Sequence, residues 1–405
     1  MHNRVLTNAR VLIEGRLVSG IDVCVRDGRI RSLTADPGER PAGVAIDDLE
    51  GRLLLPGFID FQVNGGGGVL FNDEPTVAGI ETIAEAHRRF GTTGFLPTLI
   101  SDELAVLERS MTAVREALAA GVPGVLGIHI EGPFLNEQRR GIHERRKLRR
   151  LTRAVFDELA PLPNGKTLLT IAPESVEPGI IRKLVDKGFI VSAGHSNTDY
   201  ARMCAALEEG VSGFTHLFNA MSPLATREPG VVGAALDSRD SWCGIIADGH
   251  HVSPAALRIA YRCKPPGKLI LVSDAMPPLG SPIEEFSLFG KTISVRDGAC
   301  WDEHGTLGGT VLSMAEAVRN MMRFADIELA AALELATCNP AAFLGLDQQM
   351  GRIEVGKRAD LVVADHTLQV HCTYVAGQPF AAGQSPDSAN PGDTRAAADA
   401  LRRQC

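Results

Sequence analysis

The middle of the chain contains short apolar runs that alternate with longer amphipathic segments. Eight such runs are Phe58–Val63, Gly94–Leu99, Val125–Ile130, Thr167–Ala172, Phe189–Ala193, Gly213–Leu217, Cys243–Ala247 and Leu269–Ser273. Short apolar runs are typical of buried strands, and these begin 22 to 42 residues apart, which leaves room for a helix after each. Helical periodicity does occur between them, for example over Val77–Phe90, Glu103–Ala119 and Thr198–Gly210. The pattern predicts an α/β fold with a (β/α)₈ barrel of the TIM type, and a doubly wound sheet is the alternative.

Both ends of the chain have a different, β-rich pattern. Short strands are predicted over Arg10–Gly15 and Ile21–Gly28, and again over Ala359–Asp365 and Val370–Gly377. We therefore expect a small β-sandwich domain assembled from residues 1–53 and 350–380, with the barrel formed by residues 54–349. Residues 381–405 are rich in Ala, Gly, Pro, Ser and Asp, which predicts a flexible tail.

A barrel of this type carries its active site at the C-terminal ends of its strands. Polar residues at or just beyond the ends of the predicted strands are Gln62, Asn64, Glu131, Glu174, His195, His216, Asp248, His250, His251 and Asp274. The chemistry-bearing residues therefore collect where a barrel would place a site.

Three of these residues have side chains that suit a metal ion. Glu131, His195 and His216 each lie at or just beyond the end of a different predicted strand. One carboxylate and two imidazoles can hold a catalytic zinc ion and leave a position open for water. A single histidine at such a place is more often an isolated, hydrogen-bonded residue, but three equivalent placements favour a site.

Other motifs have structural interpretations that compete with a functional one. Asp274 follows the eighth predicted strand, where it is either a general base or a turn or helix N-cap residue, and spacing alone does not decide. His129 shares a strand face with Glu131 and is expected to support the site structurally. The glycine-rich segment 64–68 lacks the Lys-Ser/Thr of a phosphate-binding loop, which favours a plain turn.

Composition excludes several classes of partner. The net charge of −8 disfavours binding to nucleic acid or to acidic membranes, and the basic segment 139–150 is interpreted as a solvated face or interface beside the site. No run of 18 apolar residues and no secretory signal is found, so a cytoplasmic enzyme or binding protein is expected. The eight cysteines contain no C-x-x-C pair, which predicts reduced thiols rather than a disulfide framework.

Six segments together resemble one family. The chain resembles the N-acetylglucosamine-6-phosphate deacetylases, which belong to the amidohydrolase superfamily, over about residues 1–380. The matching segments are LPGFID at 55–60, HIEGPF at 129–134, AGHS at 193–196, THLFNAM at 215–221, ADGHH at 247–251 and VSDA at 272–275. LPGFID marks only the superfamily, whereas the HIEGPF, THLFNAM and ADGHH segments are typical of the deacetylase branch.

The resemblance implies hydrolysis of N-acetylglucosamine 6-phosphate to glucosamine 6-phosphate and acetate. By this resemblance Glu131, His195 and His216 are the metal ligands, and Asp274 takes a proton from the attacking water and returns it to the leaving amine. His143 would help to polarise the acetyl carbonyl. The residues implied in substrate binding are Ile142, His143, Asn219, Ala220, Arg227, Asp248, His251, Leu307, Gly308 and Gly309.

The family pattern also bears on metal content and assembly. Many amidohydrolases have His-x-His where this chain has Gln62-Val63-Asn64, and amides are weak zinc ligands. We therefore expect one divalent metal ion per subunit, zinc first, with iron, manganese or cobalt as alternatives. The resemblance implies a homodimer with a phosphosugar substrate. Alternative interpretations are another amidohydrolase, such as a deaminase or cyclic amidase, and an inactive relative that acts as a scaffold.

Overall fold

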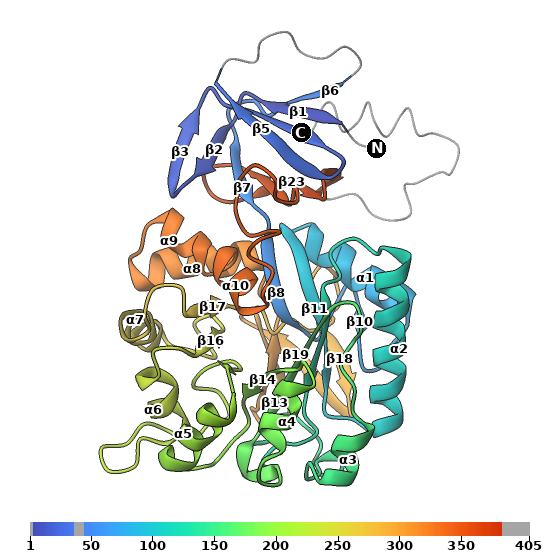
Figure 1. Cartoon of the computed structure of the whole chain (residues 1–405), viewed down its shortest axis with the longest axis vertical. Coiled ribbons are helices and arrows are strands. Elements are labelled where there is room, and N and C mark those ends of the chain that lie inside the picture. Colours follow the sequence, from blue (N-terminus) through green and yellow to red (C-terminus); the bar gives the residue numbers. More distant parts are fainter. Residues whose placement is uncertain (1–2, 36–43, 383–405) are drawn as a thin grey trace.

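The computed structural model describes residues 3–35 and 44–382, and Figure 1 shows a small β domain at one end of a larger barrel. The barrel strands are β8 (Phe58–Val63), β11 (Thr92–Ile100), β12 (Gly127–Glu131), β13 (Lys166–Ile171), β14 (Ile190–Ala193), β15 (Gly213–Phe214), β16 (Trp242–Ile245) and β17 (Leu269–Leu271). They form one parallel sheet in sequence order. A parallel bridge between Val63 and Ala275 connects its two edge regions beyond the strand ends. The predicted fold class is therefore confirmed.

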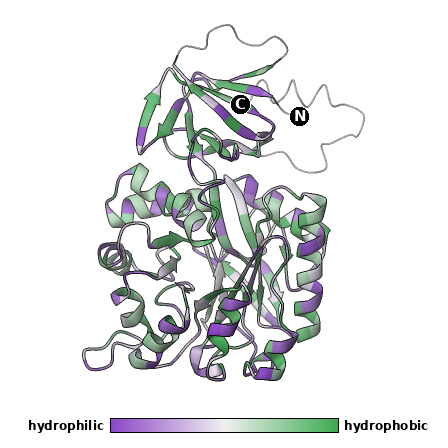
Figure 2. Cartoon of the chain, in the orientation of Figure 1, coloured by the Kyte–Doolittle hydropathy of each residue, from purple (hydrophilic) through white to green (hydrophobic). Residues whose placement is uncertain are grey.

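The strands were recognisable because they are buried on both faces. Every residue of β8, β11 and β12 is buried, so no polar alternation interrupts their apolar runs. Figure 2 shows the same division, with hydrophobic strands at the centre and hydrophilic stretches on the surrounding helices. The sixth barrel strand, β15, is only two residues long, and His216, two residues beyond its end, has a left-handed backbone conformation.

Helices cover the outside of the barrel (Figure 1). They are α1 (Val77–Arg88), α2 (Leu104–Ala120), α3 (Arg153–Glu158), α4 (Ile180–Asp186), α5 (Tyr200–Glu209), α6 (Gly230–Asp237), α7 (Pro254–Cys263), α8 (Met314–Ala325), α9 (Leu329–Glu334) and α10 (Cys338–Phe343). Four of these helices begin at a residue whose side chain accepts a hydrogen bond from a backbone N–H of the first turn. These capping residues are Thr76 for α1, Asp199 for α5, Ser253 for α7 and Ser313 for α8.

Two sheets from opposite ends of the chain form the small domain. One sheet contains β5 (Arg29–Thr34), β4 (Asp22–Arg26), β1 (Arg4–Thr7) and β6 (Ala45–Asp48), and the other contains β24 (Gln378–Ala381), β23 (Val370–Val375), β22 (Leu361–Ala364), β7 (Leu53–Pro56), β2 (Arg10–Ile13) and β3 (Arg16–Ser19). Figure 1 shows the early and late strands side by side. Leu6 and Val23 of the first sheet share a core with Leu54, Leu361 and Tyr374 of the second. The expected sandwich is present, and its boundaries with the barrel stay a prediction.

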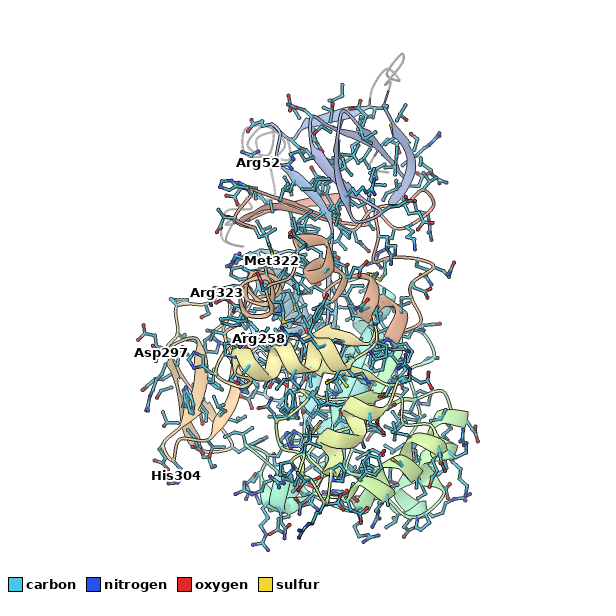
Figure 3. All side chains as sticks on the ribbon, turned by 90° about the vertical axis from the view of Figure 1, so that its left-hand side faces the viewer. Arg52, Arg258, Asp297, His304, Met322 and Arg323 are labelled. Atoms are coloured by element: carbon cyan, nitrogen blue, oxygen red, sulfur yellow. The ribbon has the colours of Figure 1, made fainter. Side chains whose placement is uncertain are left out.

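An antiparallel sheet between β17 and α8 was not predicted. Its strands are β18 (Glu285–Leu288), β19 (Lys291–Arg296), β20 (Ala299–Asp302) and β21 (Leu307–Thr310). Figure 3 shows it projecting from the barrel, with Asp297 and His304 at its turns. Leu288, Ile293 and Cys300 of this sheet pack with Ile100 at the end of β11 and with Ile142 in the loop after β12. The sheet therefore reaches the C-terminal face of the barrel, where the site is expected.

Three further expectations concern the glycine-rich segment, membrane-spanning helices and the C-terminal tail. The glycine-rich segment forms a tight hairpin of β9 (Gly65–Gly66) and β10 (Val69–Leu70), in agreement with a turn. Within residues 3–35 and 44–382, no helix combines the length and apolar character needed to span a membrane. The predicted tail lies outside the described residues from position 383 onward.

Candidate active site

Three buried side chains converge at the C-terminal end of the barrel. Glu131 is the last residue of β12, and His195 and His216 follow β14 and β15 within two residues. Glu131 Oε1 lies 3.0 Å from Nε2 of His195 and 3.0 Å from Nε2 of His216, and the two Nε2 atoms are 2.9 Å apart. Their ligand atoms all lie within 4.8 Å of one another. The structure thus brings together the three residues predicted from the strand ends.

The chemistry of this donor set fits a divalent cation. His195 Nδ1 lies 2.8 Å from the carbonyl oxygen of Arg139, which can only accept, so Nδ1 carries the proton and Nε2 is a free ligand. Burial opposes ionisation of Glu131, but the adjacent imidazoles of His195 and His216 lower its pKa well below the ordinary value. A buried carboxylate facing two imidazole nitrogens is the arrangement that zinc and similar ions bind.

The backbone at the site is strained. His195, His216 and Asp274 have φ values of 49°, 37° and 52°, in the left-handed region that residues with a Cβ atom rarely adopt. Each lies in the loop after a barrel strand, and all three line the same cavity. Such conformations persist where the surrounding structure enforces them, and they concentrate at functional sites.

Two amide side chains hold Asp274 beside the cluster. Asn64 Nδ2 donates to Asp274 Oδ1 over 2.7 Å, and Gln62 Nε2 donates to the same oxygen over 3.1 Å. Gln62 Nε2 also lies 3.4 Å from both oxygens of Glu131. Burial and, secondarily, the negative charge of Glu131 raise the pKa of Asp274, which makes it a better proton acceptor than an ordinary carboxylate.

His143 faces the same cavity as a neutral donor. The backbone N–H of Ser101 donates to His143 Nδ1 over 3.2 Å, so the ring proton is on Nε2. Burial, with the neighbouring His195, lowers the pKa of His143 well below the ordinary value. Its ring centroid lies 4.4 Å from that of His195. An uncharged imidazole with its N–H free can donate a hydrogen bond to a substrate oxygen.

A cavity of about 210 Å³ contains most of the predicted substrate-binding residues. It is lined by Asn64, Ile100, Glu131, Gly141, Ile142, His143, His195, His216, Asn219, Ala220, His251, Asp274, Met276, Thr306, Leu307, Gly308 and Gly309. Asp248 is not in the lining, but its Oδ2 lies 2.6 Å from Nδ1 of His251 and orients that ring. Arg227 is exposed on the loop before α6, outside the lining, and its phosphate contact stays a prediction.

Sequence reasoning missed several participants. In the sequence, Gln62 and Asn64 served only to argue against a second metal ion. In the structure, both side chains donate hydrogen bonds to Asp274. The carbonyl of Arg139 was not predictable, because any residue provides one. His129 lies beneath Glu131, and its Nε2 is 2.7 Å from Thr170 Oγ1, in agreement with a supporting role.

Comparisons with known proteins agree with this geometry. Residues 53–381 match the model of the amidohydrolase family. The chain belongs to the amidohydrolase family. Two curated relatives of this amidohydrolase are N-acetylgalactosamine-6-phosphate deacetylase of Shewanella sp. (strain ANA-3), 44% identical over 91% of this chain and 94% of the relative, and N-acetylglucosamine-6-phosphate deacetylase of Haemophilus influenzae, 38% identical over 87% and 93%.

A solved structure provides the same comparison in three dimensions. The crystal structure of N-acetylglucosamine-6-phosphate deacetylase from Pasteurella multocida superposes on this amidohydrolase with a TM-score of 0.89 at 36% identity, covering 94% of this chain and 100% of that one. The predicted family and the assignment as a hydrolase are therefore confirmed.

Proposed function

We propose that this amidohydrolase removes the N-acetyl group from N-acetylglucosamine 6-phosphate, giving glucosamine 6-phosphate and acetate. The observation that carries the proposal is the convergence of Glu131, His195 and His216 with Asp274 and His143 in one cavity. A metal site, a proton acceptor and a neutral donor are the groups that hydrolysis of an unactivated amide requires. The names of the relatives support the reaction type.

Glu131, His195 and His216 would hold one divalent metal ion, with zinc as the expected ion and iron, manganese or cobalt as alternatives. When bound, such an ion polarises the amide carbonyl and lowers the pKa of water. Gln62 and Asn64 occupy the places where many amidohydrolases have histidines, and their amide nitrogens already donate to Asp274. We expect these amides to prevent binding of a second ion.

Asp274 would move the proton during the reaction. It takes one proton from the attacking water while the water oxygen bonds to the acetyl carbon. The carbon–nitrogen bond then breaks, and Asp274 returns that proton to the sugar nitrogen, which leaves as the amine. His143 Nε2–H would donate to the acetyl oxygen as negative charge develops there. The step balances as amide plus water giving acetic acid and amine, and transfer of the carboxyl proton to the amine then gives acetate and the protonated amine.

Two epimeric sugars are candidates for the substrate of this reaction. N-acetylgalactosamine 6-phosphate is a second candidate substrate, because the 44% identical relative is named for it. The two sugars differ only in the orientation of one hydroxyl group, so both carry the same amide to the same catalytic residues. The cavity residues Asn219, Ala220, His251, Ile142 and the Leu307–Gly309 segment would hold the acetylated sugar.

A phosphate group needs positive charge outside this cavity. Arg227 is our candidate, with His251 at the cavity wall, since a guanidinium matches a phosphate in charge and geometry. Its exposed position suits a phosphate that projects from the cavity mouth.

We also propose that the enzyme is a homodimer, which light scattering on the purified chain can test.

The experiment that tests this proposal is acetate release from both phosphosugars under identical conditions. We expect kcat/KM for N-acetylglucosamine 6-phosphate to exceed that for the galacto epimer. The reverse order would transfer the assignment to the second candidate. No acetate from either sugar would contradict deacetylation itself.

A further inference from the structure

We propose that Glu174 is a positioning residue that ties the His195 turn to the loop carrying His143, and so sets the affinity of the metal site. The inference rests on the proposed metal site. Glu174 follows β13, in the same layer of strand ends as the three candidate ligands. It is not itself a ligand candidate, since the described cluster of ligand atoms comprises Glu131, His195 and His216.

Three donors from two separate loops converge on the Glu174 carboxylate. Oε1 accepts from Asn197 N over 2.7 Å and from Asn136 Nδ2 over 2.9 Å, while Oε2 accepts from Ser196 Oγ over 2.8 Å. We call Glu174, Asn136, Ser196 and Asn197 the clasp. Ser196 and Asn197 directly follow His195, and Asn136 begins the segment that leads to Ile142 and His143. One carboxylate thus fixes both loops.

The clasp continues through the backbone to His195 itself. Asn136 N donates to the carbonyl oxygen of His195 over 2.9 Å. Arg139 Nε donates to Asn197 Oδ1 over 2.8 Å, which holds Arg139 against the same turn. The carbonyl of Arg139 then accepts from His195 Nδ1 over 2.8 Å. Removal of the clasp would loosen the group that fixes the tautomer of His195.

The left-handed backbone at His195 explains why such a clasp is needed. A φ of 49° is unfavourable for a residue with a side chain, so the turn requires contacts on both sides. Asn136 N holds its carbonyl, and Glu174 holds the two residues after it. Partners outside the ligand set that orient ligands this way typically change metal affinity by about 10- to 100-fold when they are lost.

The test is metal affinity rather than activity. Chelator-stripped protein is titrated with Zn²⁺ in competition with a chromophoric chelator. We expect the wild type to bind one equivalent and Glu174→Ala to bind about 10- to 100-fold more weakly. Glu174→Gln should retain most of the affinity, because its amide oxygen can accept from Asn197 N and Asn136 Nδ2 while its NH₂ group donates to Ser196 Oγ. Wild-type affinity in Glu174→Ala would overturn the inference.

A matched control separates positioning from general stability. Asp365, in the turn between β22 and β23, also accepts three hydrogen bonds, from Thr367 N, Thr367 Oγ1 and Gln369 N. Asp365→Ala should leave zinc affinity unchanged, and an equal loss there would contradict a specific role for Glu174. If the wild type itself binds no zinc, the proposed metal site fails instead.

A milder variant covers the case in which Glu174→Ala does not fold. Asn136→Ala removes one donor to Glu174 and leaves the backbone bond to His195. We expect a weaker but measurable loss of zinc affinity, with the metal-free melting temperature close to that of wild type. Unchanged affinity in the folded Asn136→Ala variant would also overturn the inference.

Discussion

Asn64 and Asp274 are 210 residues apart in the chain, yet Asn64 Nδ2 donates to Asp274 Oδ1 over 2.7 Å. The contact exists because the first barrel strand, β8, meets the segment after the last one, β17, at the bridge between Val63 and Ala275. Both amides, from Gln62 and Asn64, donate to the same oxygen of Asp274, Oδ1. The closure of the barrel therefore orients the proposed proton acceptor.

Asn64→Ala should lower kcat by about tenfold or more and leave KM and metal content near wild-type values. A hydrogen bond to a charged group is worth about 1.5–3 kcal/mol, and here it holds a carboxylate in its reacting orientation. Steady-state kinetics and metal analysis of the variant provide the measurement. Asn8→Ala is the matched control, because Asn8 Nδ2 donates to Asp48 Oδ1 over 2.8 Å in the small domain. Equal kcat values for the two variants would show that the contact has no catalytic role.

Asp274→Asn should lower kcat by about 10²- to 10⁴-fold, because an amide cannot accept the water proton. Zinc binding and substrate binding should persist, since Glu131, His195 and His216 are unchanged. Single-turnover kinetics with isothermal titration of the phosphosugar separate these effects. Near-normal turnover in this variant would exclude Asp274 as the proton acceptor.

Arg227→Ala should raise KM for the phosphosugar and have little effect on the unphosphorylated N-acetylhexosamine. The expectation follows from the charge of the phosphate and the exposure of Arg227 on its loop. Arg239 is an exposed arginine in the turn after α6, and Arg239→Ala serves as the control. Similar losses on both substrates would refute the phosphate assignment.

Asp60→Asn should flatten the dependence of stability on pH. Burial raises the pKa of Asp60 to about 7, although the backbone N–H groups of Gln62 and Ser273 bond its Oδ1. An unfolded aspartate titrates near about 4, so the stabilising contribution of the protonated form is complete below that pH and is lost as the pH rises to about 7.

The asparagine variant keeps the acceptor oxygen and cannot ionise. Its melting temperature relative to wild type should therefore rise between pH 5 and pH 8, a range chosen to span the folded pKa of about 7. Thermal scans of metal-free protein across this range provide the measurement. Parallel curves for the two proteins would contradict an elevated pKa of Asp60.

The barrel could be predicted from the sequence because its strands are buried on both faces and read as apolar runs. The β18–β21 sheet was missed, although Thr292 to Arg296 alternates polar and apolar residues and Asp297-Gly298 is a hairpin turn signal. That sheet lies beside the barrel and is half exposed, so its strands lack the continuous apolar character on which the prediction depended.

The candidate ligands were predictable because each lies at or within two residues of the end of a strand, and a barrel places all these strand ends on one face. The contacts that orient them were not. Glu174 and Asn136 are 38 residues apart, and their bond depends on the path of two irregular loops. The tautomer of His195 depends on a backbone carbonyl, which leaves no trace in residue type.

The most direct test of a single-metal hydrolase is the recovery of activity as metal-free protein is titrated with Zn²⁺. Acetate release is followed from whichever phosphosugar epimer is the better substrate. We predict no turnover without metal, a linear rise to one equivalent per subunit and a plateau beyond it. Turnover by the metal-free protein, or a plateau at two equivalents, would contradict the account.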